Sequence, residues 1–342
     1  MTESQNYLPA EWEEQSGVQL TWPDDRTDWA PVLEEVLTVY EQMAAEILSR
    51  EKLLVVCRSK ELLPGFLQKE RPDLIVREMP VNDTWARDHG PMSVMENGRP
   101  VLLNFRFNGW GMKFAACHDN QITPKLYRSG AFQGPAGFRD HSWFTFEGGA
   151  IESNGNGCLL TTSTCLLSPN RNEHLSRAEI DGLVRGFFHA GKVIWLDHGY
   201  LEGDDTDSHI DTLARFCSPD TIAYVKCDNS SDIHFGELKK MEEELRTATN
   251  QHGEPFKLVA LPFPDPVFEE EGVRLPATYA NFLILNKAVL LPVYGVKQDA
   301  EARRVLASLF PGREIVGINS VPLIRQHGSV HCISMQFPEG VL

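Results

Sequence analysis

Four short polar segments of the chain carry acid, imidazole or thiol groups directly after apolar runs of strand length. They contain Asp88, Glu147, His209 with Asp211, and Cys332. Turns at strand ends are where α/β proteins usually place their functional groups. A thiol can attack a carbon centre, an imidazole can move protons, and carboxylates can hold a cation through its N–H groups. These residue types together would allow thiol attack on a bound cation.

The first two segments each have a structural interpretation beside the functional one. Asp88 could receive a cation while Trp85 offers its ring face, but Arg87 could equally pair with an Asp while Trp85 fills the core. Glu147 precedes two glycines, where a backbone turns tightly or approaches a ligand. Taken alone, that glutamate is more typical of an exposed turn.

The last two segments have the same two interpretations. Alternation along a strand predicts that His209 and Asp211 share one face, with Ile210 buried opposite. The segment is not a calcium loop, because Ile210 stands where the loop requires glycine and Phe216 where it requires glutamate. Cys332 follows a turn with a glycine and could be reactive, although an isolated cysteine is more often a small buried hydrophobe.

The elements that must position these groups alternate along the whole chain. Amphipathic periodicity predicts helices over 31–50, 176–189, 232–249 and 298–309, and Ser176 with Glu179 has the pattern of a capping box. Apolar runs predict strands over 53–57, 74–76, 101–105, 158–162, 193–196, 222–225, 258–261, 282–285, 289–291 and 315–317. This order indicates an α/β fold. No linker divides the chain and 262–271 reads as a surface loop, so we expect one domain over residues 1–342.

Composition narrows the class of protein. The chain of 342 residues has 32 basic and 48 acidic residues, a net charge of -16, which disfavours nucleic acid and anionic membranes as partners and would attract cationic ligands. The polar start of the chain has no secretory signal, and no apolar stretch is long enough to span a bilayer. Seven scattered cysteines fit reduced thiols. We therefore expect a cytoplasmic protein.

In this order, the motifs resemble those of the agmatine deiminase and bacterial-type peptidylarginine deiminase family, within the guanidine-modifying (pentein) superfamily. The resemblance runs essentially end to end, through the segments 8–12, 20–23, 85–91, 147–149, 170–176, 205–211, 275–282 and 331–332. Two departures leave the substrate open. Agmatine-specific members are glycine-rich just before the nucleophile, whereas the segment 326–330 of this chain has one glycine, Gly328. Ser208 stands where the family often has the glycine that precedes the histidine.

The resemblance implies a five-bladed α/β propeller of ββαβ units around a central active-site channel. It implies that Cys332 is the nucleophile, His209 the acid and base, and Glu147 the support of that histidine. Asp88 and Asp211 would bind the guanidinium. Trp85 and Trp22 would also contact substrate, and neither cofactor nor metal is required.

The leading hypothesis is an enzyme that converts agmatine to N-carbamoylputrescine and ammonia through a covalent amidino-cysteine, in putrescine biosynthesis. A second keeps the site but acts on arginine residues in peptides, giving citrulline. A third is a metal-dependent hydrolase with His209, Asp211, Glu147 and Cys332 as ligands. A fourth is a non-catalytic module that binds polyamines. The expected partner is a small cationic guanidine, and pairing with a second copy in a homodimer stays open.

Overall fold

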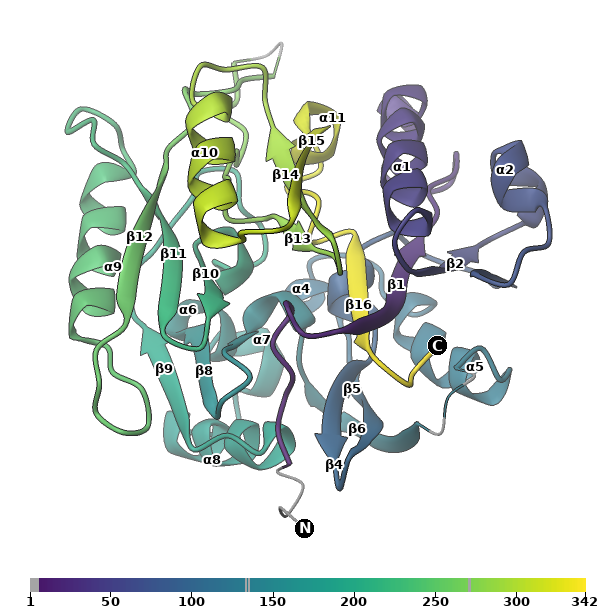
Figure 1. Ribbon diagram of the computed structural model, residues 1–342, viewed down its shortest axis with the longest axis horizontal. Helices are drawn as coiled ribbons and strands as arrows, with labels where there is room; N and C mark the ends of the chain where they lie inside the picture. Colours follow the sequence, from purple (N-terminus) through teal and green to yellow (C-terminus); the bar gives the residue numbers. More distant parts are fainter. Residues whose placement is uncertain (1–5, 133, 135, 270–271) are drawn as a thin grey trace.

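Strands and helices alternate along the chain, and the strands group into separate small sheets. The computed structural model describes residues 6–132, 134, 136–269 and 272–342. Within these residues there are five sheets, with strand orders β16-β1-β2-β3, β4-β5-β6, β7-β8-β9, β10-β11-β12 and β13-β14-β15. Figure 1 shows the sheets set around a common centre, with helices such as α8 and α9 on the outside.

The strands of the described residues are β1 (Gln15–Thr21), β2 (Lys52–Cys57), β3 (Leu74–Glu78), β4 (Met92–Glu96), β5 (Arg99–Arg106), β6 (Gly137–Thr145), β7 (Glu152–Ser153), β8 (Cys158–Thr162), β9 (Lys192–Leu196), β10 (Ala214–Ser218), β11 (Thr221–Lys226), β12 (Lys257–Pro262), β13 (Leu283–Ile284), β14 (Ala288–Val293), β15 (Glu314–Asn319) and β16 (Ser334–Pro338).

The α-helices are α1 (Leu33–Leu48), α2 (Gly65–Gln68), α3 (Ala86–His89), α4 (Gly109–Met112), α5 (Ile122–Arg128), α6 (Ser163–Leu166), α7 (Pro169–Asn172), α8 (Arg177–Phe188), α9 (Phe235–Thr247), α10 (Asp299–Leu309) and α11 (Val321–Ile324). Short 3₁₀ helices are η1 (Ala30–Val32), η2 (Lys60–Leu62), η3 (Asp119–Gln121), η4 (Gly148–Ala150) and η5 (Ile210–Thr212).

One connection pattern recurs in every sheet. In the second sheet, β4 pairs antiparallel with β5, a helical segment that includes α5 follows, and β6 then pairs parallel with β5. The same sequence of antiparallel pair, helix and parallel strand occurs around α8, α9 and α10. Each unit is therefore a ββαβ unit, because a parallel third strand needs a crossover helix.

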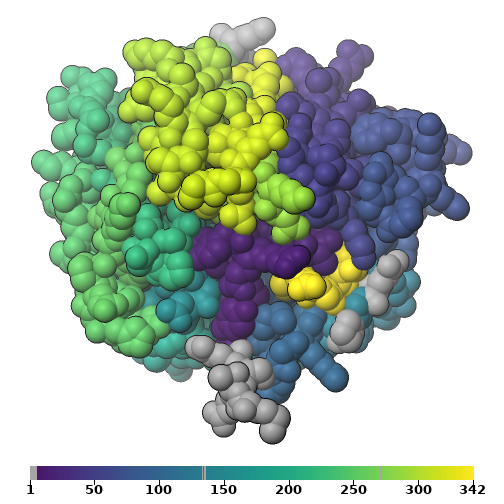
Figure 2. Space-filling view, viewed as in Figure 1, coloured from purple at the N-terminus to yellow at the C-terminus, as the bar shows by residue number. Residues whose placement is uncertain are grey.

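The two ends of the chain build the remaining unit together. β16 pairs antiparallel with β1, β1 pairs parallel with β2, and α1 connects β1 to β2. Figure 1 shows β16 beside β1, and Figure 2 shows the first and last parts of the chain in contact at the surface. The last strand of the sequence therefore serves as the first strand of this unit.

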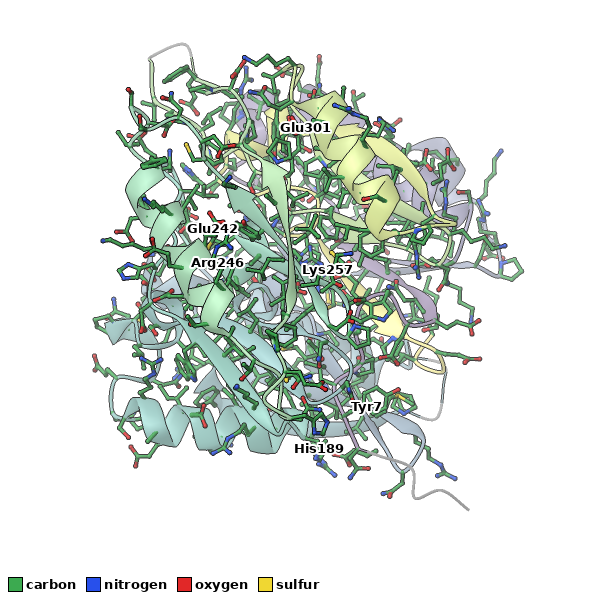
Figure 3. The ribbon with its side chains drawn as sticks, turned by 60° about the vertical axis from the view of Figure 1, so that its left-hand side comes forward. Tyr7, His189, Glu242, Arg246, Lys257 and Glu301 are labelled. Atoms are coloured by element: carbon green, nitrogen blue, oxygen red, sulfur yellow. The ribbon has the colours of Figure 1, made fainter. Side chains whose placement is uncertain are left out.

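Local sequence explains the outer helices. The predicted capping box is confirmed, since the Ser176 hydroxyl accepts from the Glu179 backbone N–H and the Glu179 carboxylate accepts from the Ser176 backbone N–H. In α9, Leu238, Met241 and Leu245 are buried at helical spacing. Polar side chains such as Glu242 and Arg246 lie one turn apart on the same helix (Figure 3).

The centre of the molecule is polar, although apolar clusters surround it. Three clusters of buried apolar side chains lie between the described sheets and helices. In contrast, Glu147, Asp211 and Arg215 are fully buried, and His209 is 1% exposed. Buried charges are costly unless they are paired or have a function. The fold therefore directs its acids and bases inward to one place.

The structure corrects parts of the sequence-based prediction. Residues 209–211 are not a strand, because His209 leads into the 3₁₀ helix η5 and β10 starts at Ala214. The strands β1, β4, β6, β7, β10 and β16 were not predicted. No helix among the described residues is long and apolar enough to cross a membrane. The expected absence of a signal falls on residues 1–5, outside the described residues, and part of the expected loop 262–271 does too.

Candidate active site

Four of the five units send side chains to one site from the segment just before their first strand. Asp88 lies in α3 before β4, and Glu147 lies before β7. His209 and Asp211 flank the start of η5 before β10, and Cys332 lies before β16. The structure thus brings together all five residues that the sequence singled out, although they are far apart along the chain.

Asp88 is a buried carboxylate held by two donors. The backbone N–H of Gly149 donates to Oδ1 at 2.9 Å, and the indole N–H of Trp110 donates to Oδ2 at 2.9 Å. Donors on both oxygens fix the plane of the carboxylate. Burial and the neighbouring carboxylates of Asp211 and Glu147 raise the pKa of Asp88 overall, while His209 and the hydrogen bond from Trp110 favour its ionised form. Each oxygen keeps a lone pair for a further N–H donor. Asp88 can therefore bind a planar cation in a defined orientation.

Asp211 lies beside the thiol and is held on one oxygen only. Nδ1 of His331 is 2.7 Å from Oδ2, and Oδ2 is 3.8 Å from the Cys332 sulfur. Oδ1 is buried and has no hydrogen-bond partner among the described residues. Burial alone would raise the pKa of Asp211, but the hydrogen bond from His331 and its charge lower it overall. Oδ1 of this ionised carboxylate is thus free to accept an N–H from a ligand.

His209 stands between two carboxylates. Its Nδ1 is 3.7 Å from Asp88 Oδ1, and its Nε2 is 3.7 Å from Glu147 Oε2. Neither ring nitrogen has a hydrogen-bond partner in the described part of the chain. Burial would lower the pKa of His209, but the carboxylate of Asp88, the neighbouring Cys165 and the contact with Glu147 raise it well above its ordinary value. His209 is therefore held as an imidazolium with N–H groups available.

Glu147 is kept ionised by a buried arginine. Nε of Arg171 donates to both carboxylate oxygens, at 2.8 and 3.0 Å, and both side chains are fully buried. Burial would raise the pKa of Glu147, but the guanidinium of Arg171 lowers it overall. Arg171 also bonds Asp207 and the backbone oxygen of Thr206. This arginine therefore links Glu147 to the loop that carries His209.

The Cys332 thiol has an unusual environment for a nucleophile. Burial raises its pKa well above the ordinary value, and the carboxylates of Asp211 and Asp88 raise it further. The resting sulfur is therefore protonated. A cation placed between the two aspartates would offset their charge and lower the thiol pKa.

A pocket adjoins this site. It is lined by Asp88 and Cys332, and also by Asp28, Asp83 and Asp205. Among the described residues that line it, none is Lys or Arg. Burial, with the neighbouring acids Asp28 and Asp119, raises the pKa of Asp83 to about 8. The pocket therefore suits a ligand with positive charge along its length.

Of the two tryptophans predicted to contact substrate, one lines the pocket. Trp85 does, with its indole N–H donated to Asp83 Oδ2 at 3.0 Å. Trp22 does not line it, because its ring is 1% exposed and packs edge-to-face on Tyr40 in the core. The substrate contact of Trp22 stays a prediction. The ion pair considered for Arg87 with an Asp is also absent among the described residues, since Arg87 contacts His331 and Met335 instead.

Sequence reasoning missed several polar partners of the site. Trp110, Arg171 and His331 orient Asp88, Glu147 and Asp211 respectively. His331 and Arg171 stand in segments that the family resemblance includes, so their place in those motifs was an available signal. Trp110 carried no such signal, because its contact depends on a left-handed backbone turn with φ 54°.

Two groups of side chains in the described part of the chain could hold a metal ion. Glu147, Cys165 and His209 form one, and a second consists of Glu11, Glu152 and His331; in each, one ligand atom per residue lies within 4.8 Å of the others. In both groups an arginine already pairs with the carboxylates, Arg171 in the first and Arg215 in the second. Cys332 and Asp211 belong to neither group. The sulfur of Cys165 lies 3.9 Å from Oε2 of Glu147, so this buried cysteine borders the site.

Known proteins share both the sequence pattern and the fold. The family model for Porphyromonas-type peptidyl-arginine deiminase matches residues 7–338. A Porphyromonas gingivalis structure provisionally described as an arginine deiminase is 48% identical, with a TM-score of 0.93 and coverage of 99% of this chain and 100% of that one. A C. jejuni agmatine deiminase variant with substrate bound is 37% identical, with a TM-score of 0.90 and coverage of 99% and 98%.

A plant relative extends the likeness beyond bacteria. The agmatine deiminase of Medicago truncatula is 30% identical, over 97% of this chain and 96% of its own length. The fold is thus the pentein propeller, as predicted, and the class of protein is a hydrolytic deiminase. The chain belongs to the Porphyromonas-type peptidyl-arginine deiminase family, which was also the family predicted from its motifs.

Proposed function

We propose that this protein hydrolyses agmatine to N-carbamoylputrescine and ammonia. The observation that carries the proposal is one pocket that ends at a thiol and a carboxylate and has further acids along its walls. Agmatine has a guanidinium at one end and an ammonium at the other. The guanidinium would reach Asp88 and Cys332, and the ammonium would lie near Asp83 and Asp205. Free arginine would bring its carboxylate to the same acids and be repelled.

The first half of the reaction forms a covalent intermediate. Asp88 and the free Oδ1 of Asp211 bind N–H groups of the guanidinium and hold its plane against the sulfur. The thiol proton is released to solvent as the cation lowers the thiol pKa. The sulfur of Cys332 then bonds to the central carbon, the C–N bond to one terminal nitrogen breaks, and His209 gives that nitrogen a proton. Ammonia leaves, and an amidino-thioether remains.

The second half hydrolyses that intermediate. His209, now neutral, takes a proton from water, and the oxygen bonds to the same carbon. The C–S bond breaks and the sulfur leaves as a thiolate, while the hydroxyl proton on the new C–O group passes to solvent as the C=O of a substituted urea forms. Solvent then returns a proton to the thiolate, and the urea is released. Glu147 and Asp88 stabilise each return of His209 to the imidazolium. The product keeps the carbon chain of putrescine, so we place the reaction in putrescine biosynthesis in the cytoplasm.

An ammonia-release screen tests the proposal. Purified protein is assayed with agmatine, free arginine and arginine-containing peptides, and the Cys332→Ala variant serves as the blank. We expect turnover with agmatine and none with the variant. If arginine-containing peptides were the preferred substrates, the protein would be a peptidyl-arginine deiminase, as the description of its family states. Activity lost with a chelator and restored by metal would support the metal-dependent hypothesis, and binding without turnover the polyamine-binding one.

A further inference from the structure

A second thiol lies beside the acid–base histidine. Cys165 is part of α6, directly after β8, and is fully buried. Its sulfur is 3.9 Å from Oε2 of Glu147, and the same oxygen is 3.7 Å from Nε2 of His209. One ligand atom from each of these three residues lies within 4.8 Å of the other two. The proposed reaction needs no second thiol, so this cluster has a feature that catalysis does not explain.

The spacing of the three atoms suits a zinc ion. Zinc binds nitrogen and oxygen at about 2.0–2.2 Å and sulfur at about 2.3 Å. At a tetrahedral angle, nitrogen and oxygen are then about 3.4 Å apart, and sulfur and oxygen about 3.6 Å apart. The observed distances of 3.7 and 3.9 Å are each longer by about 0.3 Å. Small side-chain movements would therefore bring all three ligands onto one ion.

The histidine nitrogen of the cluster is available to a ligand. Nε2 of His209 faces Glu147 and has no hydrogen-bond partner among the residues that the structure describes. Buried polar atoms without a partner are uncommon, and they often mark the place of an ion or a water molecule. Arg171 donates to Oε2 of Glu147 at 2.8 Å, but a carboxylate oxygen keeps a second lone pair that can bind a metal.

The charges of the cluster also allow a divalent ion. Metal ligands must lose their protons, so an ion here would release the Nε2 proton of His209 and the thiol proton of Cys165 to solvent. Two protons would leave as two positive charges enter. The net charge beside Arg171 would therefore stay the same, and the ion would add no repulsion to the buried Glu147–Arg171 pair.

One hydroxyl group holds the thiol and the histidine in register. The side chain of Thr162 accepts the backbone N–H of Cys165 at 3.4 Å and donates to the backbone oxygen of Ser208 at 2.7 Å. It thus joins α6 to the residue that precedes His209. Ligands that are already in place bind with a smaller entropic cost. The pocket lined by Asp88 is one side chain away from His209, which gives an ion a short path to the cluster.

We propose that Glu147, Cys165 and His209 form an inhibitory binding site for a zinc ion. A thiolate and an imidazole with one carboxylate favour zinc over magnesium or calcium, which prefer oxygen ligands alone. Bound zinc would occupy the Nε2 lone pair, so His209 could no longer act as the imidazolium acid. The inhibition rests on the proposed function, in which His209 is that acid. Binding of the ion does not depend on turnover and can be measured separately.

Cobalt binding tests the site directly, because Co²⁺ accepts the ligands of zinc and gives a charge-transfer absorption band when a thiolate binds it. The titration uses Cys332→Ala, so that the nucleophile cannot supply the sulfur. We expect a sulfur-to-cobalt band that zinc abolishes by displacing cobalt. Adding Cys165→Ala should remove the band. Adding alanine at the exposed Cys117 or at the buried Cys158 should leave it unchanged.

Inhibition of turnover tests the consequence. Ammonia release from agmatine is followed while a chelator buffer sets the concentration of free zinc, and each variant is compared with its own rate without zinc. Zinc should inhibit wild type, and excess chelator should restore activity, the opposite of a metal-dependent hydrolase. In Cys165→Ala the inhibition constant should rise by roughly tenfold or more, since even outer partners of metal ligands contribute that much affinity. Cys158→Ala should keep the wild-type constant.

Two results would overturn the proposal. One is a cobalt band that is absent from folded Cys332→Ala or that persists after Cys165→Ala is added. The other is an equal inhibition constant for zinc in Cys165→Ala and wild type, which would place the inhibiting ion on other residues.

A reading that keeps Cys165 in place covers a variant that fails to fold. In Cys332→Ala with isotope-labelled histidines, saturating zinc should shift the NMR signal of Nε2 of His209, and an unchanged signal would also refute the site. Failure of the proposed function looks different. Wild type would then release no ammonia from agmatine even with excess chelator, while the cobalt band would remain.

Discussion

Gly149 and His209 approach each other so closely that no side chain fits between them. A Cβ on Gly149 would lie 2.5 Å from Nδ1 of His209 and 2.9 Å from Oδ1 of Asp88. The φ angle of Gly149 is not in the left-handed region, so the glycine is needed for space and not for conformation. This contact explains the second glycine of the Glu147-Gly148-Gly149 segment.

Gly149→Ala should therefore displace His209 and Asp88 and leave the fold intact. We expect kcat/KM to fall about 10²-fold, because displacements near 1 Å cost that much in a preorganised site. The comparison is Gly182→Ala in α8, where a Cβ would meet nothing within 4 Å. That variant should keep full activity and gain about 0.5–1 kcal/mol of stability. Equal activity in the two variants would contradict the close contact.

Glu147→Gln should change the pH profile of kcat. Burial lowers the pKa of His209, but Asp88 and Glu147 raise it well above its ordinary value. Removing one of these charges must lower it, so the imidazolium acid is lost at lower pH and the alkaline limb of kcat moves down. Arg171 would lose a buried partner, which should also cost about 3 kcal/mol of stability. An alkaline limb that stays in place would show that Glu147 does not act on His209.

Trp110→Phe should weaken substrate binding by releasing Asp88. The indole N–H donates to Oδ2 at 2.9 Å, while the ring packs on Phe107 and Phe114. Phenylalanine keeps most of the packing and loses the donor. A hydrogen bond to a charged group contributes about 1.5–3 kcal/mol, so kcat/KM for agmatine should fall by roughly tenfold or more. Steady-state kinetics measure this, and wild-type values would refute a role for the indole N–H.

Agmatine binding should strengthen as pH rises from about 6 to about 9. Burial and nearby acids raise the pKa of Asp83 to about 8, so this carboxyl is largely protonated at neutral pH. A bound cation favours the ionised form, and affinity therefore increases as the proton is lost. Calorimetric titration of Cys332→Ala with agmatine measures binding without turnover. Asp83→Asn should flatten the pH dependence, and an unchanged dependence in that variant would place the ammonium elsewhere.

His331→Asn and His331→Gln should differ, because they replace different nitrogens of the imidazole. Asparagine can place an N–H near the position of Nδ1, which is 2.7 Å from Asp211, whereas glutamine reaches towards Glu11 as Nε2 does. Without the donor, the pKa of Asp211 rises, so the acidic limb of kcat/KM should move to higher pH in His331→Gln. His331→Asn should keep the limb near its wild-type position. Identical profiles in the two variants would exclude a specific role for Nδ1.

The sequence was sufficient to predict the outer helices and that Asp88, Glu147, His209, Asp211 and Cys332 belong to one site, whereas their roles in the reaction stay predictions. Asp88, Glu147 and Cys332 could be recognised as candidates by their residue type and their position after apolar runs. Helices such as α8 could be recognised by hydrophobic periodicity and capping residues. The first strands β4, β7, β10 and β16 were missed because they are short or lack a continuous apolar run; β7 has two residues. The first strand β13 also has two residues, but it lies within the apolar run 282–285 and was predicted.

What could not be predicted depends on contacts between units. A thiol such as Cys165 or an indole such as Trp110 acquires a role only from the neighbour that it faces. Alternation of polar and apolar residues predicted a strand that contains His209 and Asp211. In the structure, His209 instead caps the 3₁₀ helix η5 and Asp211 lies within it, so the backbone of these residues belongs to no sheet. Trp22 lies in the segment 20–23, which is part of the family resemblance. In the structure its ring packs against Tyr40.

The pairing of β16 with β1 has a consequence for synthesis of the protein. Leu20 pairs with Ser334, more than 300 residues later, and Ser334 is two residues beyond the nucleophile. Contacts of such long separation form late, because closing the loop costs entropy before any pairing compensates for it. A nascent chain still missing its last strand has no partner for this edge of β1. The surroundings of Cys332 are therefore completed only after β16 has been synthesised and has paired with β1.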